Sequence, residues 1–274
     1  MRHRRVATIA TVALAGTVMA GCSGMDRLGT APTPDCTVAS DGHVVELEFA
    51  QAANAATITA VGVGRGLPPR AMIVALATAW QESKLHNIDY GDRDSLGLFQ
   101  QRPSQGWGSE EEILDPRYAA TAFYEHLERV PEWESMRVTD AAQTVQRSAF
   151  PEEYEQWADD SAAMVDAFTG VTPKALRCVQ VERPGEGVST SDLGRALSLD
   201  WGESAEYVEI DGGIAVSVSS VEDGWRYASW LVAHSTERGI ATVEFDGRRW
   251  HAESGEWETP EAAGDDATVI ATVH

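Results

Sequence analysis

Apolar residues recur at helical spacing through much of the first two thirds of the chain. The clearest segment is 67–83, where prolines open the first turn, which tolerates them, and Ile73, Leu76 and Trp80 then fall on one face. Residues 87–101 are instead dense in Asp, Gly and Ser, which predicts a loop or a short hairpin. We expect helices at residues 51–63, 67–83, 116–129, 139–148 and 152–168.

The pattern changes after the Pro- and Gly-containing segment 183–187. Alternating apolar positions predict strands at 214–218, 240–245 and 267–273, and residues 222–237 have the pattern of an amphipathic helix. This combination predicts an α+β fold class, because helices and strands are largely segregated along the chain. We expect two domains, a mainly helical one at residues 37–180 and a smaller α+β one at residues 188–274.

The N-terminus has the pattern of a secretory signal peptide, which we place at residues 1–21. Its apolar run, residues 6–20, is shorter than the roughly 20 residues that a membrane-spanning helix needs. The residues from Met19 to Cys22 resemble a bacterial lipobox, in which the cysteine takes a diacylglycerol anchor. The resemblance implies lipidation at Cys22 and attachment to the extracytoplasmic face of the cell membrane. A plain signal peptide cut near Ala20 is the alternative.

Residues 22–36 are rich in Gly, Pro, Thr and Ser, which predicts a tether between the lipid and the first domain. Lipidation of Cys22 leaves Cys36 and Cys178, an even pair in an oxidising compartment. We therefore expect a disulfide that closes a loop of about 140 residues. Two free buried thiols are the alternative.

Composition and charge exclude several functions. The chain has 274 residues, of which 43% are hydrophobic, enough for a folded core. Its formal net charge of −22 argues against sequence-independent binding of nucleic acid, which depends on Lys and Arg at phosphates. No CxxC or HExxH pairing suggests a metal site, and no cofactor is implied.

The candidate chemistry centres on Glu82, at the end of the strongest predicted helix. Ala75, Thr78 and Ala79 precede it by seven, four and three residues and so share its face, where small side chains would leave a space above the carboxylate. A glutamate in a partly apolar cleft has a raised pKa and can donate a proton to a glycosidic oxygen. The alternative is an ordinary surface pair with Lys84.

Two motifs then resemble the lysozyme-like superfamily, which includes lytic transglycosylases and lysozymes. In that family a catalytic Glu-Ser pair ends a core helix, and a following loop carries Gly-Leu-Met/Phe-Gln. Glu82-Ser83 and Gly97-Leu98-Phe99-Gln100 match in this order, and the resemblance covers roughly residues 45–170. The family's Ala-Tyr-Asn element is absent, and residues 145–150 occupy about its place.

This resemblance implies cleavage of the β-1,4 bond between N-acetylmuramic acid and N-acetylglucosamine in peptidoglycan, with Glu82 as acid and then base. The implied substrate cleft contains Ser83, Gly97, Phe99, Gln100 and Gln101. Trp107 is a further candidate for stacking on a sugar, because it lies between glycines in Gln105-Gly106-Trp107-Gly108.

A second carboxylate would decide between hydrolysis and formation of an anhydro sugar. The candidates are Asp89, Asp92 and Asp94, all in the loop after the Glu82 helix. Transglycosylases use one glutamate, and the 6-hydroxyl of the substrate completes the reaction. A solvated acidic loop is the alternative for these aspartates.

The second domain faintly resembles a D-alanyl-D-alanine-type zinc peptidase. Ser191 and Ser198 stand where that family's pattern has its His and Asp ligands, and the last strand, 267–273, contains no histidine. The resemblance therefore implies a peptidase-like domain without metal. We expect His234 and His251 to be surface or core residues.

These observations favour a lipid-anchored protein that cleaves or remodels peptidoglycan glycan strands, as a lytic transglycosylase or a muramidase. A non-catalytic peptidoglycan-binding or scaffold lipoprotein is the alternative. A solute-binding transporter component would need the alternating strands and helices of its lobes, which the sequence lacks.

Overall fold

The structure, a computed structural model, describes residues 35–147, 152–180, 189–202, 205–260 and 267–274. The expected signal peptide, the lipidated Cys22, nearly all of the tether and the break at 183–187 lie outside these residues. Within them, no helix combines the length and the apolar character that crossing a membrane requires.

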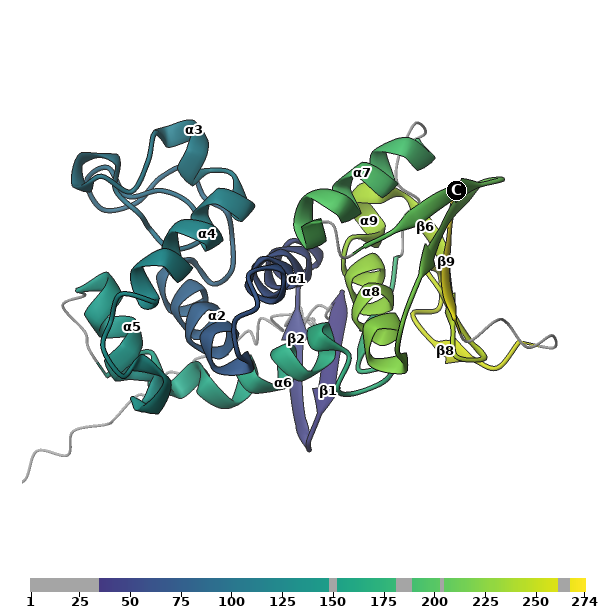
Figure 1. Cartoon of the computed structure of the whole chain (residues 1–274), viewed down its shortest axis with the longest axis horizontal. Coiled ribbons are helices and arrows are strands. Elements are labelled where there is room, and N and C mark those ends of the chain that lie inside the picture. The colour runs from purple at the N-terminus through teal and green to yellow at the C-terminus, as the bar shows by residue number, and fades with distance from the viewer. Residues whose placement is uncertain (1–34, 148–151, 181–188, 203–204, 261–266) are drawn as a thin grey trace, which may run out of the picture. The chain divides into compact units, whose positions relative to one another are not determined.

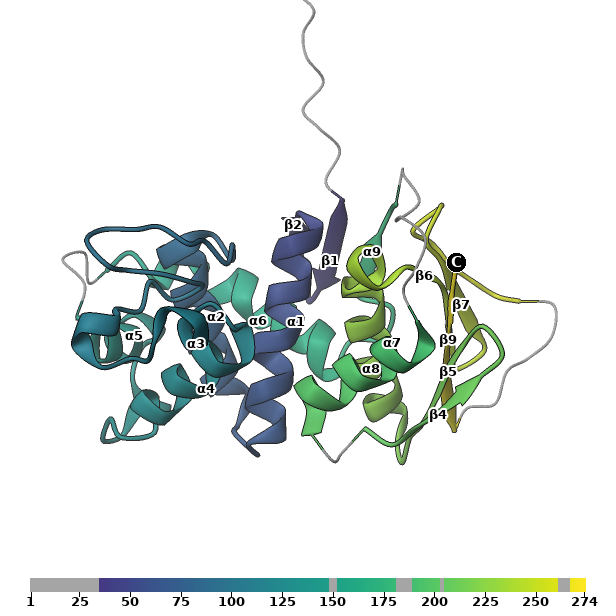
Figure 2. The ribbon, with the colours of Figure 1, turned by 90° about the horizontal axis from the view of Figure 1, so that it is seen from above.

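Helix α1 (Phe49–Gly64) lies at the centre of the folded part (Figures 1 and 2). Its buried positions are mostly Ala, Thr and Gly, so that other helices approach it closely. On one side it contacts α2 (Pro69–Ser83) and α4 (Pro116–Leu127), and on the other α7 (Thr190–Trp201) and α8 (Val221–Ala233). The helix thus joins the two regions that the sequence assigns to separate domains.

The remaining helices of the first region largely follow the predicted periodicity. Besides α1, α2 and α4, it contains α3 (Glu110–Ile113), α5 (Val138–Gln146) and α6 (Ala158–Thr169). The last of these begins later than predicted, because residues 152–157 form a turn and a short 3-10 helix. In that turn Tyr154 and Trp157 point inward, toward the end of α2. The segment therefore positions side chains instead of extending the helix.

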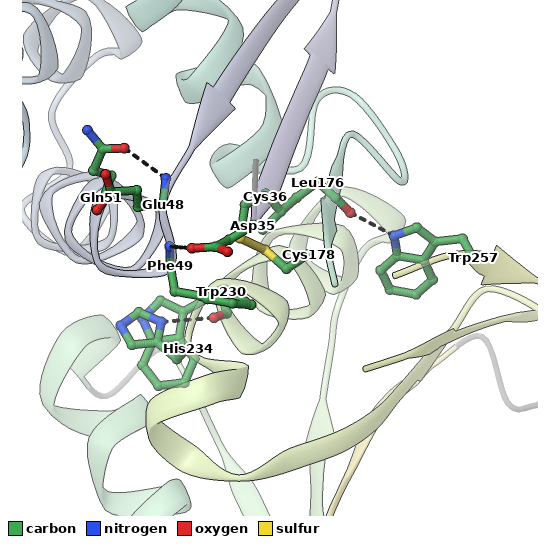
Figure 3. The surroundings of a disulfide bond; sticks show 10 residues. All are labelled: Asp35, Cys36, Glu48, Phe49, Gln51, Leu176, Cys178, Trp230, His234 and Trp257. Carbon is green, nitrogen blue, oxygen red and sulfur yellow. Dashed lines mark hydrogen bonds between the residues drawn. A yellow bond between two sulfur atoms is a disulfide. The ribbon is translucent and has the colours of Figure 1, made fainter. Parts of the chain in front are cut away.

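A three-stranded antiparallel sheet joins the start of the folded part to the end of the first region. Strand β1 (Cys36–Ser40) lies between β2 (His43–Leu47) and β3 (Leu176–Cys178). Cys36 and Cys178 are directly opposite each other and form a disulfide, as predicted (Figure 3). Near it, the Trp257 indole donates a hydrogen bond to the Leu176 carbonyl at 2.9 Å, which attaches the second region to this sheet (Figure 3).

A six-stranded antiparallel sheet dominates the second region, with the order β4-β5-β9-β6-β7-β8. Strands β5 (Gly213–Ser217), β6 (Ile240–Phe245) and β9 (Thr268–Val273) correspond to the three predicted strands. The predicted helix at 222–237 is divided into α8 and the short α9 (Ser235–Arg238). The α+β class is confirmed. Within this sheet, the strands that the sequence did not predict are β4 (Tyr207–Ile210), β7 (Arg248–His251) and β8 (Trp257–Glu258).

A buried polar network links helices of the two regions around Asp200 of α7, whose side chain is fully buried. Its Oδ2 accepts hydrogen bonds from the Thr57 hydroxyl at 2.8 Å and from the Trp230 indole at 2.7 Å. Its Oδ1 lies 2.5 Å from Nε of Arg117. The imidazole of His234 stacks on Trp230, and burial lowers its pKa. The network therefore connects α1, α4, α7 and α8 through one carboxylate.

We expect Asp200→Asn to lower the free energy of unfolding by about 2–3 kcal/mol, because it removes a charge-assisted contact and leaves Arg117 without its buried counterion. The Arg117 side chain is 28% exposed, so solvent replaces part of the loss. Urea unfolding measures the change. The matched variant is Asp192→Asn on the same helix. The side chain of Asp192 is 46% exposed, so this substitution should lower the free energy of unfolding by less than about 1 kcal/mol. Equal losses in both variants would contradict this role for Asp200.

Candidate active site

Glu82 lies in the last turn of α2, half-buried, with its carboxylate held by two side chains from elsewhere in the fold. The Tyr154 hydroxyl donates a hydrogen bond to Oε1 at 2.6 Å, and the side chain of Gln146 also hydrogen-bonds the carboxylate. Burial raises the pKa of Glu82 above its ordinary value, although both hydrogen bonds act in the opposite direction. Glu82 therefore gives up its proton less readily than an exposed glutamate, and its carboxyl group is held in position.

The end of α2 is tied to the loop that follows it. Lys84 and Leu85 both adopt left-handed backbone conformations, with φ of 55° and 59°, which ends the helix. The buried Ser83 hydroxyl donates to the Leu98 carbonyl at 2.8 Å, and Gln146 donates to the Phe99 carbonyl at the same distance. Gln146 thus contacts both the candidate acid and the loop.

Gly97 lets this loop pass close to α3. Its φ is 74°, a conformation that favours glycine, and a Cβ atom there would lie 2.7 Å from the Ile113 carbonyl oxygen. After it, Leu98 and Phe99 are fully buried, and Phe99 stacks on Phe123 with ring centroids 4.7 Å apart. The motif therefore anchors the loop to the core below the site.

Several of the expected substrate contacts are buried in the structure. Ser83, Phe99 and Gln101 are all buried, and the Gln101 amide donates to the Ala119 carbonyl at 3.0 Å. Gly97 is buried too, so these four residues mainly pack the loop against the core. Gln100 is half-buried, and its amide donates to two carbonyls of the same loop. In the structure, the residues of this motif form the frame of the loop next to Glu82.

The three candidate aspartates differ in their surroundings. Asp94 accepts hydrogen bonds from Ser104 N at 2.8 Å and Arg102 Nε at 2.7 Å, and Ser104, then Arg102, hold its pKa well below its usual range. Asp89 and Asp92 are exposed on the loop. Among the described residues, no hydrogen bond or ion pair joins any of the three to Glu82. Asp94 therefore braces the loop.

A groove of about 750 Å³ includes Gln146 in its lining, and its other lining residues are Gln105, Trp107, His126, Arg129, Val130, Pro131, Thr144, Val145 and Arg147. Trp107 forms part of its wall and lies against His126, with ring centroids 4.0 Å apart. Because Gln146 also hydrogen-bonds Glu82, the groove lies one side chain away from the candidate acid. Trp107 is thus placed on a concave surface beside the site, as a stacking residue needs to be.

Tyr154 and Gln146 were not identified as site residues from the sequence. Gln146 lies in the segment 145–150, which the resemblance aligns with the Ala-Tyr-Asn element of transglycosylases, so this alignment was a sequence signal for it. No sequence signal marked Tyr154, because it is a single tyrosine in a turn. The structure fixes this turn through Trp157, which stacks on Trp80 at 5.4 Å and donates to Gln81 at 2.8 Å.

Replacing Tyr154 by Phe should move the alkaline limb of the pH profile of kcat/KM to higher pH. The Tyr154 hydroxyl stabilises the Glu82 carboxylate, so its loss raises the pKa of Glu82 further and keeps the acid protonated over a wider range. The profile of the variant, measured beside the wild type, checks this. A lower rate with an unmoved limb would mean that Tyr154 serves only packing.

The residues of the second region that resemble peptidase ligand positions do not form a metal site in the part that is described. Among the described residues, no three His, Cys, Asp or Glu side chains are arranged to hold a metal ion. Ser191 and Ser198 both lie on α7, and His234 is buried in the Asp200 network. His251 is half-buried in β7.

Comparisons with known proteins place no family name on this arrangement. Neither models of known protein families nor curated protein sequences match the chain.

Proposed function

We propose that this protein cleaves the glycan strands of peptidoglycan, with Glu82 as the acid and then the base. The observation that carries the proposal is the state of Glu82, a half-buried carboxyl whose pKa burial raises and which Tyr154 and Gln146 hold beside a groove. General acid catalysis needs a proton donor of this kind near neutral pH.

We propose a lytic transglycosylase in preference to a muramidase, because one glutamate is enough for its reaction. Glu82 donates its proton to the glycosidic oxygen as the bond from that oxygen to C1 of the muramic acid breaks. The resulting carboxylate then takes the proton from the 6-hydroxyl of the same sugar, whose oxygen bonds to C1 and closes an anhydro ring. The proton returns to Glu82 and no water is consumed. Asp94 is hydrogen-bonded by Ser104 and Arg102 within its own loop, whereas a hydrolase would need a second carboxylate across the bond.

We further propose that the protein acts from the extracytoplasmic face of the cell membrane, anchored by lipid on Cys22, with peptidoglycan as its partner. The disulfide supports an oxidising compartment, since such bonds are rare where thiols are kept reduced. A lipid anchor would keep the site near the inner surface of the wall, so long-range attraction to the wall would not be needed.

The other candidate is a peptidoglycan-binding or scaffold lipoprotein without activity. The excess of acidic residues, 43 against 21 basic ones, favours it in one respect, because enzymes that attack whole walls gain from positive charge.

Digestion of purified sacculi by the full chain in detergent, followed by mass spectrometry, separates these functions. Anhydromuramyl ends are the expected product. Reducing ends would establish a muramidase and return attention to Asp89 and Asp92. Binding to sacculi without any released fragment would favour the non-catalytic protein.

A further inference from the structure

The groove beside Glu82 differs in charge from the rest of the chain. The protein has 43 acidic and 21 basic residues, yet none of the described residues that line the groove is acidic. Two arginines, Arg129 and Arg147, and His126 are its ionisable side chains. A surface of this sign on so acidic a protein concentrates anions locally.

Both arginines are available for a ligand. Arg147 follows the last residue of α5 and has no ion-pair partner among the residues that the structure describes. Arg129 lies 3.7 Å from Glu125 with its side chain 68% exposed, so this contact is weak and easily exchanged. Guanidinium groups bind carboxylates through paired hydrogen bonds, so two of them in one groove suit a ligand that carries carboxylates.

The position of the groove indicates which part of a substrate would reach it. Gln146 touches Glu82 on one side and lines the groove on the other, so a substituent on a sugar next to the cleaved bond would extend along this side chain. The Trp107 and His126 rings lie against each other there, with centroids 4.0 Å apart. In peptidoglycan, the substituent of muramic acid that carries carboxylates is the peptide.

We infer that Arg129 and Arg147 bind peptide carboxylates, so that the substrate is the peptide-bearing glycan strand and peptide-free strands bind poorly. This inference rests on the proposed function, since it assumes that the glycan lies across Glu82. A site that contacts only the sugars would not distinguish peptide-bearing strands from peptide-free ones.

Binding to soluble glycan fragments tests the inference without turnover. The full chain with Glu82→Gln is titrated with peptide-bearing fragments, freed of wall phosphate polymers, and with the same fragments after an amidase has removed the peptides. We expect the peptide-bearing form to bind about tenfold more tightly, the gain of one net charge-assisted contact. Arg129→Gln with Arg147→Gln should abolish this preference.

The control is Arg195→Gln, an arginine on α7 with 70% exposure, close to the 68% of Arg129, which should retain the preference. Equal affinity of the two fragments, a preference that survives the double substitution, or no binding of either fragment would overturn the inference. The proposed function is tested independently of this inference, and it is refuted if the protein with Glu82 intact releases no glycan fragments from sacculi. If the peptide preference depends on the arginines but the protein releases no fragments, the peptide-binding site is supported and the proposed enzymatic activity is refuted.

Discussion

Replacing both Cys36 and Cys178 by Ala should lower the free energy of unfolding by about 4–5 kcal/mol. The bond joins residues 142 positions apart and closes a loop around the whole first region, so its loss frees a large part of the unfolded chain. Strand β1 depends on it most, because β1 holds both β2 and β3 in the small sheet. We therefore expect the start of the folded part to lose its order first.

Urea unfolding of the full chain, without reductant, measures this loss. Cys22→Ser is the matched control, since it removes a cysteine that the disulfide does not use and should leave the midpoint unchanged. Reductant added to the wild type should reproduce the midpoint of the double variant. If the double variant and the wild type unfold at the same urea concentration, the disulfide does not support the fold.

Replacing Glu82 by Gln should reduce the release of glycan fragments by about 10²–10⁴-fold, the contribution of a positioned acid. The amide has nearly the same shape and can still accept the hydrogen bond from Tyr154, but it has no proton of suitable acidity to give. The effect should fall on kcat more than on KM, because the proton moves only in the transition state.

The same variant should be more stable than the wild type at neutral pH. Since the folded state raises the pKa of Glu82, the protonated form is favoured, and stability is lost as the pH rises through that raised pKa. The neutral amide avoids this loss, so Tm should rise near pH 7 and match the wild type below the ordinary pKa of 4.5. Thermal unfolding at both pH values checks this. A lower Tm at neutral pH would show that the substitution damages the site and would make the activity loss uninformative.

Local pattern predicted the helices better than the small sheet. The apolar stripe of Ile73, Leu76 and Trp80 was sufficient for α2, because a helix buries one face through contacts three and four residues apart. Strand β1 pairs with β3 about 140 residues later, and a five-residue strand carries no local sign of such a partner. The sequence therefore predicted a tether up to residue 36 but not that strand β1 begins at Cys36.

The candidate site was predicted in part for a similar reason. Spacing placed Glu82 at a helix end and the Gly97 motif in a loop, but residue types do not say which side chains of a loop face inward. Phe99 and Gln101 turned out to face the core, where they are held by Phe123 and by the Ala119 carbonyl. Tyr154 reaches Glu82 from 72 residues away, a contact that depends on how α6 packs on α2.

The most direct test of the central claim compares three full-length proteins on purified sacculi, namely the wild type, Glu82→Gln and Glu206→Gln. Glu206 is exposed and lies in the second region, so its substitution controls for the loss of a carboxylate as such. We predict anhydromuramyl fragments from the wild type and Glu206→Gln at similar rates, and almost none from Glu82→Gln. Equal release by all three would contradict a catalytic role for Glu82.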